Sequence, residues 1–126
     1  MKISLVIPTY NRLDSLKRVL TGLEHQQDIS FSDFEVIVIS DGSTDDTNAY
    51  LQTLNTPLNL VPLIQQNGGA AAARNNGIQH ACGELILFLD DDVFPTPRLI
   101  AEHRETHQSQ SSAVAVLGPM LTPDDF

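Results

Sequence analysis

The stretch that decides the fold is Glu84-Leu-Ile-Leu-Phe-Leu-Asp-Asp-Asp-Val-Phe94. Residues 85–89 are all apolar, which is typical of a strand buried on both faces of a parallel sheet. Three carboxylates, Asp90, Asp91 and Asp92, follow at once. Close negative charges repel by about 4 kcal/mol per pair at an effective dielectric of about 20, so we expect a compensating cation. Oxygen ligands suit Mg²⁺ or Mn²⁺; a solvated acidic turn is the alternative.

The composition is that of an ordinary globular protein, and 126 residues are enough for one domain with its own core. The net charge of −9 argues against nucleic acid as a partner. No apolar run reaches the length of a membrane span, and residues 1–4 lead into a strand rather than a signal peptide. The single cysteine, Cys82, excludes an intramolecular disulfide. We therefore expect a small buried thiol in a cytoplasmic protein.

Strand and helix patterns alternate along the chain. Apolar runs predict strands at 3–7, 34–39, 58–64, 85–89 and 113–117. Helices are expected at 13–25, at 45–54, from the Gly68-Gly69 pair onward and at 97–107. This alternation predicts an α/β fold, an open and mostly parallel sheet with helices on both faces. Pro62 cannot donate to a ladder, which places the third strand at a sheet edge.

Local capping signals predict where three of the helices begin. Asn11 is expected to cap the first helix. Ser43 and Asp46 are spaced as in a capping box for the second helix. Thr96 is followed by Pro97, a favoured first helical residue, before the last helix.

Right-handed crossovers between parallel strands bring the carboxyl ends of all strands to one edge of the sheet. Residues 8–12 follow the first strand, Asp41 follows the second, and the acidic triplet follows the fourth. Ligands of open α/β sheets bind at that edge. The sequence therefore predicts one binding site there, assembled from separate loops.

Four segments together resemble the inverting glycosyltransferases of family 2, which have the GT-A nucleotide-diphospho-sugar fold. They are Val6-Ile-Pro-Thr-Tyr-Asn-Arg12, Ser40-Asp-Gly-Ser-Thr-Asp-Asp-Thr47, Gly68-Gly-Ala-Ala-Ala-Ala-Arg-Asn-Asn-Gly77 and Leu89-Asp-Asp-Asp92. The resemblance covers residues 2–118. It implies transfer of a sugar from a nucleotide-diphosphate donor to a hydroxyl acceptor, with Mg²⁺ or Mn²⁺ as cofactor.

The resemblance also implies roles for individual residues in donor binding. The loop after the first strand, with Pro8, Thr9, Tyr10 and Arg12, would surround the base and ribose. For Pro8 the alternative is a role in ending the strand, and for Asn11 of the same loop helix capping and binding are both open. Asp41 matches the acid that accepts a hydrogen bond from the base, which suits uracil, thymine or guanine and therefore UDP-, dTDP- or GDP-linked donors. Its alternative role is that of a turn residue before a glycine.

Three further roles concern the diphosphate, the ribose and the metal. Arg74 matches a basic residue that approaches the diphosphate or ribose, with a surface salt bridge as the alternative. In the acidic Asp-x-Asp motif, the resemblance implies that Asp91 contacts the ribose and Asp92 binds the metal. Asp90 is left to orient the loop.

The general base that deprotonates the acceptor is not identifiable in the sequence. Glu102 and Glu105 are explained by a solvated helix, and Asp124 and Asp125 by a polar tail. We therefore interpret residues 1–126 as a single nucleotide-sugar-binding domain, the N-terminal part of a longer transferase.

Two other functions remain open from the sequence. One is a nucleotide-binding module without turnover. The other is a haloacid-dehalogenase-type phosphatase with Asp90 as nucleophile. The phosphatase is disfavoured because it requires its nucleophile on the first strand and a later lysine, and no lysine follows Lys17.

Overall fold

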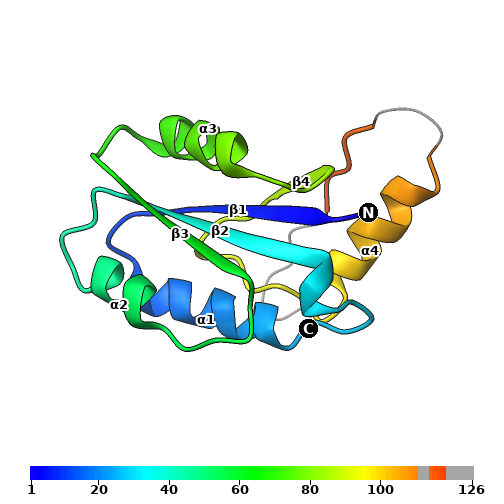
Figure 1. Cartoon of the computed structure of the whole chain (residues 1–126), viewed down its shortest axis with the longest axis horizontal. Coiled ribbons are helices and arrows are strands. Elements are labelled where there is room, and N and C mark those ends of the chain that lie inside the picture. Colours follow the sequence, from blue (N-terminus) through cyan, green and yellow to red (C-terminus); the bar gives the residue numbers. More distant parts are fainter. Residues whose placement is uncertain (111–113, 119–126) are drawn as a thin grey trace.

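The computed structural model describes residues 1–110 and 114–118, and its centre is a four-stranded sheet in the order β3-β2-β1-β4 (Figure 1). All three strand pairs are parallel. The strands are β1 (Ile3–Thr9), β2 (Phe34–Asp41), β3 (Leu60–Gln65) and β4 (Leu85–Phe88). The predicted parallel α/β sheet is confirmed.

Helices cover both faces of the sheet, as predicted (Figure 1). Three of them, α1 (Leu13–Glu24), α2 (Thr47–Thr53) and α4 (Leu99–Gln108), lie on one face. The opposite face carries α3 (Ala70–His80). A short 3₁₀ turn, η1 (Phe31–Asp33), leads into β2.

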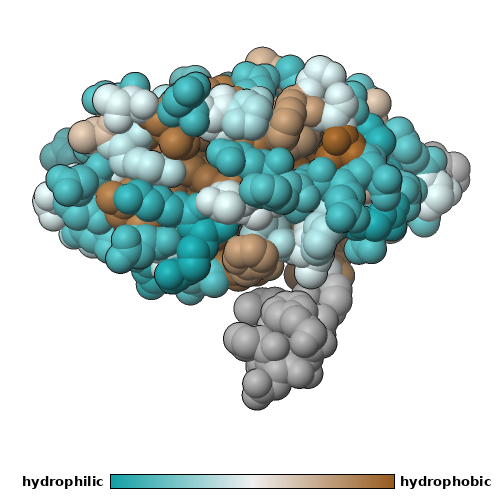
Figure 2. Space-filling view, turned by 90° about the horizontal axis from the view of Figure 1, so that it is seen from below, coloured by the Kyte–Doolittle hydropathy of each residue, from teal (hydrophilic) through white to brown (hydrophobic). Residues whose placement is uncertain are grey.

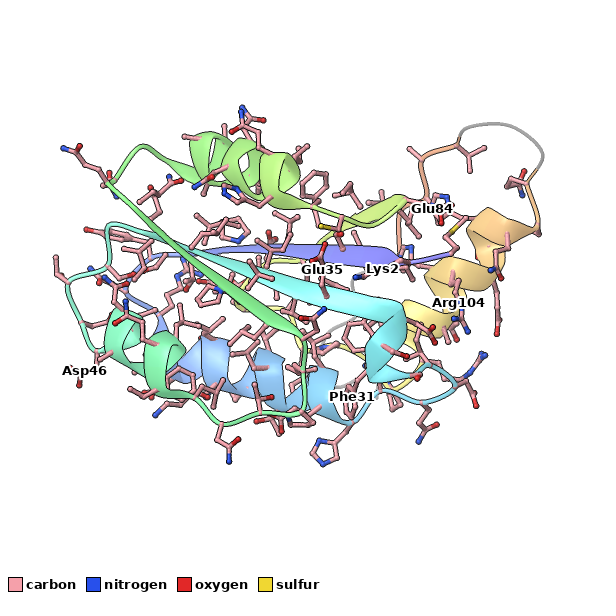
Figure 3. All side chains as sticks on the ribbon, in the orientation of Figure 1. Lys2, Phe31, Glu35, Asp46, Glu84 and Arg104 are labelled. Carbon is pink, nitrogen blue, oxygen red and sulfur yellow. The ribbon has the colours of Figure 1, made fainter. Side chains whose placement is uncertain are left out.

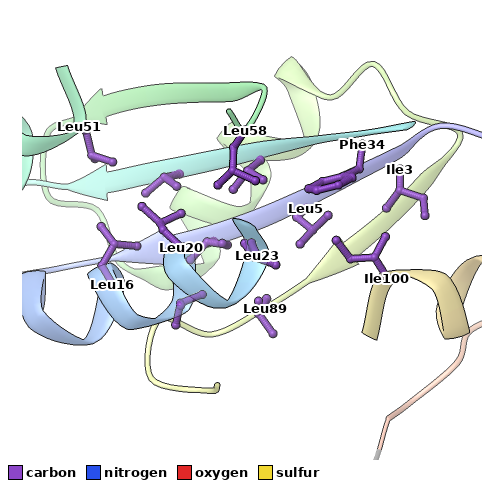
Figure 4. Close-up of a cluster of buried hydrophobic side chains, with 14 residues drawn as sticks. Ile3, Leu5, Leu16, Leu20, Leu23, Phe34, Leu51, Leu58, Leu89 and Ile100 are labelled. Carbon is purple, nitrogen blue, oxygen red and sulfur yellow. The ribbon is translucent and has the colours of Figure 1, made fainter. Parts of the chain in front are cut away.

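The core is formed on both sides of the two central strands because successive side chains of a strand point to opposite faces. Leu5 on β1 packs with Leu20 and Leu23 of α1 in the larger cluster, which Figure 4 shows together with Phe34. Val6, the next residue of β1, packs instead with Ala73 of α3. The helical spacing of the apolar residues in α1 places them on one side of that helix.

A buried polar group fixes the turn before β4. The carboxylate of Glu35, which is 4% exposed on β2, accepts the Ser4 hydroxyl at 2.5 Å and the Cys82 N–H at 2.7 Å (Figure 3). The Ser4 hydroxyl in turn accepts the Gly83 N–H at 2.8 Å. These bonds hold the start of β4 against β1. Cys82 itself is exposed, so the expected buried thiol is wrong.

The two edge strands differ in how well the sequence predicts them. Pro62 lies on edge strand β3 opposite Val38, as expected. The apolar strand β4 was expected to be buried on both faces, but among residues 1–110 and 114–118 it forms the other edge of the sheet. Residues 85–87 are half-buried and Phe88 is 48% exposed. A strand with a neighbour on one side only loses the cover that a second neighbouring strand provides.

The predicted strand at 113–117 is wrong for the residues described. Residues 114–118 form no strand, and Leu117 is 97% exposed; Ala113 lies outside the described residues. An apolar run without a ladder partner leaves its backbone hydrogen bonds to water, so apolar character alone does not make it a strand.

The helix starts depart from the capping signals. Asn11 does not cap α1, whose N-cap is Arg12. Ser43 does not form a capping box with Asp46; its hydroxyl accepts the Asn11 N–H at 3.2 Å instead. The Asn11 and Ser43 side chains therefore form hydrogen bonds that join two different loops instead of capping the helix that follows each of them.

The second and fourth helices begin two residues later than predicted. Helix α2 begins at Thr47, whose N–H is bound by the Asp45 carboxylate at 3.0 Å. Helix α4 begins at Leu99 because the Thr96 carbonyl accepts the Leu99 N–H at 3.2 Å, which forms a turn over residues 96–98.

The face seen in Figure 2 is mostly hydrophilic, with apolar residues in smaller areas between polar ones. Across residues 1–110 and 114–118, none of the helices combines the length and the apolar character needed to cross a bilayer.

Gly77 sets how closely α3 approaches the sheet, and its replacement is a test of the fold. A Cβ atom at this position would lie 2.6 Å from Val6 Cγ1 and 2.9 Å from Ile39 Cδ1. We expect Gly77→Ala to lower the free energy of unfolding by about 1–3 kcal/mol, measured by urea denaturation. The control Asn75→Ala, on the exposed side of the same helix, should leave stability nearly unchanged or raise it slightly. Equal stability of both variants would contradict the packing of α3.

Candidate functional site

A cleft of about 460 Å³ opens at the carboxyl edge of the sheet, which is within the range of small-molecule sites. Loops after all four strands contribute to it. Its walls are Pro8, Thr9, Tyr10, Arg12, Asp41, Asn67, Gly69, Ala70, Arg74, Asp90, Asp91 and Asp92. The eight residues that the sequence assigned to donor or metal binding therefore all lie in this one cleft, whereas Asn11 does not line it.

The acidic triplet is balanced by two arginines from other elements. The Arg12 guanidinium nitrogen Nη1 lies 3.5 Å from Asp91 Oδ1 and 3.1 Å from Asp92 Oδ2. Arg74, in the second turn of α3, lies 3.4 Å from Asp90. We expected a cation to offset the repulsion within the acidic triplet. In the protein itself, the guanidinium groups of Arg12 and Arg74 provide positive charge there.

Asp91 is the buried member of the triplet, at 8% exposure, and its Oδ2 accepts the Thr9 hydroxyl at 2.9 Å. Burial raises the pKa of Asp91 above its ordinary value, and the charges of Asp92 and Asp90 raise it further. The hydrogen bond from Thr9 and the charge of Arg12 oppose this rise. A further positive charge beside Asp91, in addition to the two arginines, would stabilise its ionised form.

Asp41 holds the loop between β3 and α3. Its carboxylate accepts the N–H groups of Gly68 at 2.8 Å and Gly69 at 3.0 Å, and the Gln65 amide at 2.9 Å. Burial raises the pKa of Asp41, but the bonds from Gly68, Gln65 and Gly69 together outweigh it and leave the pKa below its ordinary value. Asp41 is thus a structural anchor for this wall of the cleft, whatever it contacts in a ligand.

The glycines of this loop are required by its conformation. Gly69 has φ of 94°, which side-chain-bearing residues rarely adopt, and its N–H donates to the Asp41 carboxylate. Gly42 has φ of 77°, and a Cβ atom there would lie 2.7 Å from Asn67 Cβ. The two loops therefore approach one another as closely as glycine permits.

Asn11 joins the loops after β1 and β2. It has φ of 52°, a conformation that Asn tolerates better than most residues. Its side-chain oxygen accepts the N–H groups of Thr44 at 2.7 Å and Asp45 at 3.2 Å. The neighbouring Tyr10 and Arg12 are thereby held at the cleft on a fixed backbone.

The residues present fit a divalent cation that is partly coordinated by a ligand. In the described part of the chain, no three His, Cys, Asp or Glu side chains are grouped to hold a metal ion. Mg²⁺, however, commonly uses only one or two carboxylates plus waters and substrate phosphates. The oxygens of Asp91 and Asp92 already converge on one cationic atom, Arg12 Nη1, and this geometry shows that the pair accommodates positive charge.

Sequence reasoning missed part of the cleft wall. Asn67 and Ala70 line it without a role predicted for either, and Asn67 donates its amide to the Asp41 carbonyl at 2.9 Å. The Asn67-Gly68 pair is a turn signal directly after an expected strand, and it could have indicated a loop at the ligand-binding edge.

Comparison with known proteins identifies the family. Residues 4–126 match the sequence model described as "Glycosyl transferase family 2". The chain belongs to glycosyltransferase family 2. This membership agrees with the four motifs that the cleft brings together.

Two individual glycosyltransferases match most of the chain. It is 33% identical over 115 residues to the uncharacterized glycosyltransferase YfnE of Bacillus subtilis, covering 90% of this chain and 29% of that protein. It is 37% identical over 118 residues to the validoxylamine A glucosyltransferase of Streptomyces hygroscopicus subsp. jinggangensis. This match covers 92% of this chain and 28% of that protein.

Solved structures show the same fold, the GT-A fold of these glycosyltransferases. TarS of S. aureus, in complex with UDP, matches with a TM-score of 0.78 at 30% identity, over 86% of this chain and 32% of that chain. The mannosyltransferase PcManGT from Pyrobaculum calidifontis, in complex with GDP-Man and Mn²⁺, matches with a TM-score of 0.65 at 27% identity. This match covers 76% of this chain and 29% of that chain. This family 2 chain spans less than a third of the length of these relatives.

The role of Asp41 as an anchor predicts a pH-dependent contribution to stability. Its pKa is lower in the folded state, so the ionised group stabilises the fold above the unfolded value of about 3.9, and this contribution is lost as the pH falls below it. We expect Asp41→Asn to lower the free energy of unfolding by about 1–3 kcal/mol at pH 7. The difference from wild type should shrink toward pH 3.

Urea denaturation between pH 7 and pH 3 measures this difference. Asp46→Asn removes the same charge from an exposed side chain outside the cleft, and its stability should follow that of wild type. A difference for Asp41→Asn that is constant over the whole pH range would contradict the anchoring role of the carboxylate.

Proposed function

We propose that this chain is the donor-binding part of an inverting glycosyltransferase, and that it binds a nucleotide-diphosphate sugar together with Mg²⁺ or Mn²⁺. The observation that supports this most is the cleft in which three carboxylates and two guanidinium groups meet from separate loops. TarS in complex with UDP or UDP-GlcNAc, and PcManGT in complex with GDP-Man and Mn²⁺, support a donor linked to UDP, dTDP or GDP.

The proposed donor lies along the cleft with its base near β1 and β2. Tyr10 is 49% exposed at the wall, so its ring is free to stack on a base. Pro8 and Thr9 border the same region. The Asp41 carboxylate accepts a hydrogen bond from the base in addition to those from Gln65, Gly68 and Gly69. Asp91 contacts the ribose.

The diphosphate is placed between the arginines and the end of β4. Arg74 lies near the N-terminus of α3, where the helix dipole also favours an anion. Asp92 is the proposed metal ligand because its side chain is 54% exposed in the cleft, whereas Asp91 is buried and bonded to Thr9. A bound Mg²⁺ or Mn²⁺ would supply positive charge against the negative charge that develops on the departing diphosphate.

The proposed reaction is a single displacement. The acceptor hydroxyl oxygen forms a bond to the anomeric carbon, the bond from that carbon to the diphosphate oxygen breaks, and the hydroxyl proton passes to a general base. Attack on the face opposite the diphosphate inverts the configuration. Asp41 and Asp91 are buried and hydrogen-bonded, and Asp92 is the proposed metal ligand. We therefore propose that the base is a residue outside this acidic cluster, in a part of the protein that follows it.

A second candidate is a module that binds nucleotide without turnover, because none of the residues that line the cleft is assigned as the general base. Family membership, with the acidic triplet after the fourth strand rather than the first, leaves no support for the phosphatase alternative. The cytoplasmic location suggested by the single cysteine stays a prediction.

Metal-dependent nucleotide binding is the direct test of the donor site. Calorimetry with UDP, GDP and dTDP, each with and without Mn²⁺, should show tighter binding of at least one nucleotide when Mn²⁺ is present. Asp92→Asn should abolish the Mn²⁺ effect because it removes the proposed ligand charge. Asp46→Asn should retain the effect, since Asp46 does not line the cleft. If no nucleotide binds better with Mn²⁺ to the folded wild type, the proposed donor site is wrong.

Transfer itself separates the catalytic function from the non-catalytic one. We expect the 126-residue chain to bind donor without transferring sugar, and a chain continuing beyond residue 126 to transfer it. Release of nucleoside diphosphate in the presence of candidate hydroxyl acceptors measures this. Turnover by the 126-residue chain alone would place the general base within residues 1–126.

A further inference from the structure

Arg12 is the residue whose contacts the proposed function does not yet explain. A single atom, Nη1, contacts both Asp91 and Asp92, at 3.5 and 3.1 Å. Building on the proposed donor site, we propose that Arg12 is an internal counter-ion that occupies the position of the dication in the ligand-free protein. When the dication and a nucleoside diphosphate bind, Arg12 moves from the carboxylates to the diphosphate, and this exchange makes the two ligands bind cooperatively.

The dication and Arg12 compete for the same oxygen. Mg²⁺ binds its oxygen ligands at about 2.1 Å, and Asp92 Oδ2 is the oxygen that the guanidinium contacts. Two cations at one carboxylate repel each other, so a dication that arrives alone has to displace Arg12 into the cleft without a new partner. Binding of the dication alone is therefore weakened.

The surroundings of Arg12 allow its side chain to move while its backbone stays in place. The preceding residue, Asn11, is bonded to Thr44 and Asp45 across the loops. On the other side of the contact, Asp91 is held by Thr9. The Arg12 side chain between them is 54% exposed and lines the cleft.

A diphosphate in the cleft would change this balance. Guanidinium groups bind phosphate oxygens through a planar fork of donors, so the released Arg12 gains a partner that replaces the two carboxylates. The dication then binds Asp92 without leaving an unpaired arginine. By linkage, each ligand raises the affinity for the other by the same factor. Arg74 differs because its contact is to Asp90 and not to the proposed metal ligand.

The test separates metal affinity from nucleotide affinity. The affinity for Mn²⁺ alone is obtained by measuring free Mn²⁺ with electron paramagnetic resonance in the absence of nucleotide. The affinity for UDP or GDP is measured by calorimetry with and without Mn²⁺. Arg12→Gln should bind Mn²⁺ alone about fivefold or more tightly than wild type, and the factor by which Mn²⁺ improves nucleotide binding should fall correspondingly. Arg12→Lys keeps the charge but not the planar fork of donors, so its Mn²⁺ affinity and its cooperativity should lie between those of wild type and Arg12→Gln.

Arg104→Gln is the matched control for the lost charge. Arg104 pairs with Asp33 at 3.3 Å, at the end of the molecule opposite Asp46 and the loops of the cleft (Figure 3). The Arg104→Gln variant should have the same Mn²⁺ affinity and the same cooperativity between Mn²⁺ and nucleotide as wild type. A change in Arg104→Gln as large as that in Arg12→Gln would show a general charge effect and overturn the proposal.

The outcomes distinguish this inference from the proposed function. Mn²⁺-dependent nucleotide binding in wild type, with unchanged or weaker Mn²⁺ binding in Arg12→Gln, would overturn the counter-ion role and leave the donor site standing. Absence of Mn²⁺-dependent binding in wild type would overturn both. Circular dichroism of each variant establishes that it is folded, and the Lys variant provides the same comparison if the Gln variant is not.

Discussion

The parallel pairing of β1 with both β2 and β4 brings the loops after these strands to one edge of the sheet. There the charges of Asp90, Asp91 and Asp92 have to be offset within a few ångströms of one another. Arg12 and Arg74 provide that offset from the loop after β1 and from α3. The cleft is therefore an electrostatic arrangement that the backbone topology makes possible and that oppositely charged side chains hold together.

The cleft combines fixed and movable parts. Asn11 and Asp41 tie neighbouring loops through bonds to backbone N–H groups, which constrain the shape of the walls. Arg12 and Asp92 are half-exposed, and their contact lies on the solvent side. Preformed walls lower the entropy that a ligand loses on binding, while the exposed pair retains the freedom to exchange partners.

Conventional local signals predicted the elements better than their ends or their surroundings. The apolar run at 85–89 correctly predicted a strand, but apolar character does not distinguish a central strand from an edge strand. Within the part of the chain that the structure describes, β4 pairs with β1 alone. Asn11 and Ser43 are typical capping residues, yet they bond to each other's loops. Such choices depend on which loops meet in space, and spacing along the chain does not contain that information.

The sequence by itself determined the alternation of strands and helices, the edge position of β3 through Pro62, and the set of residues that meet at the carboxyl edge. These follow from local periodicity, from proline lacking an N–H and from the constant handedness of crossovers. Only the tertiary structure decided that Asp41 anchors the glycine loop, that Thr9 holds Asp91, and that Arg12 spans two carboxylates. Those contacts join residues up to 82 positions apart, and side chains so distant in sequence acquire definite partners only when the packed sheet fixes the distances between their loops.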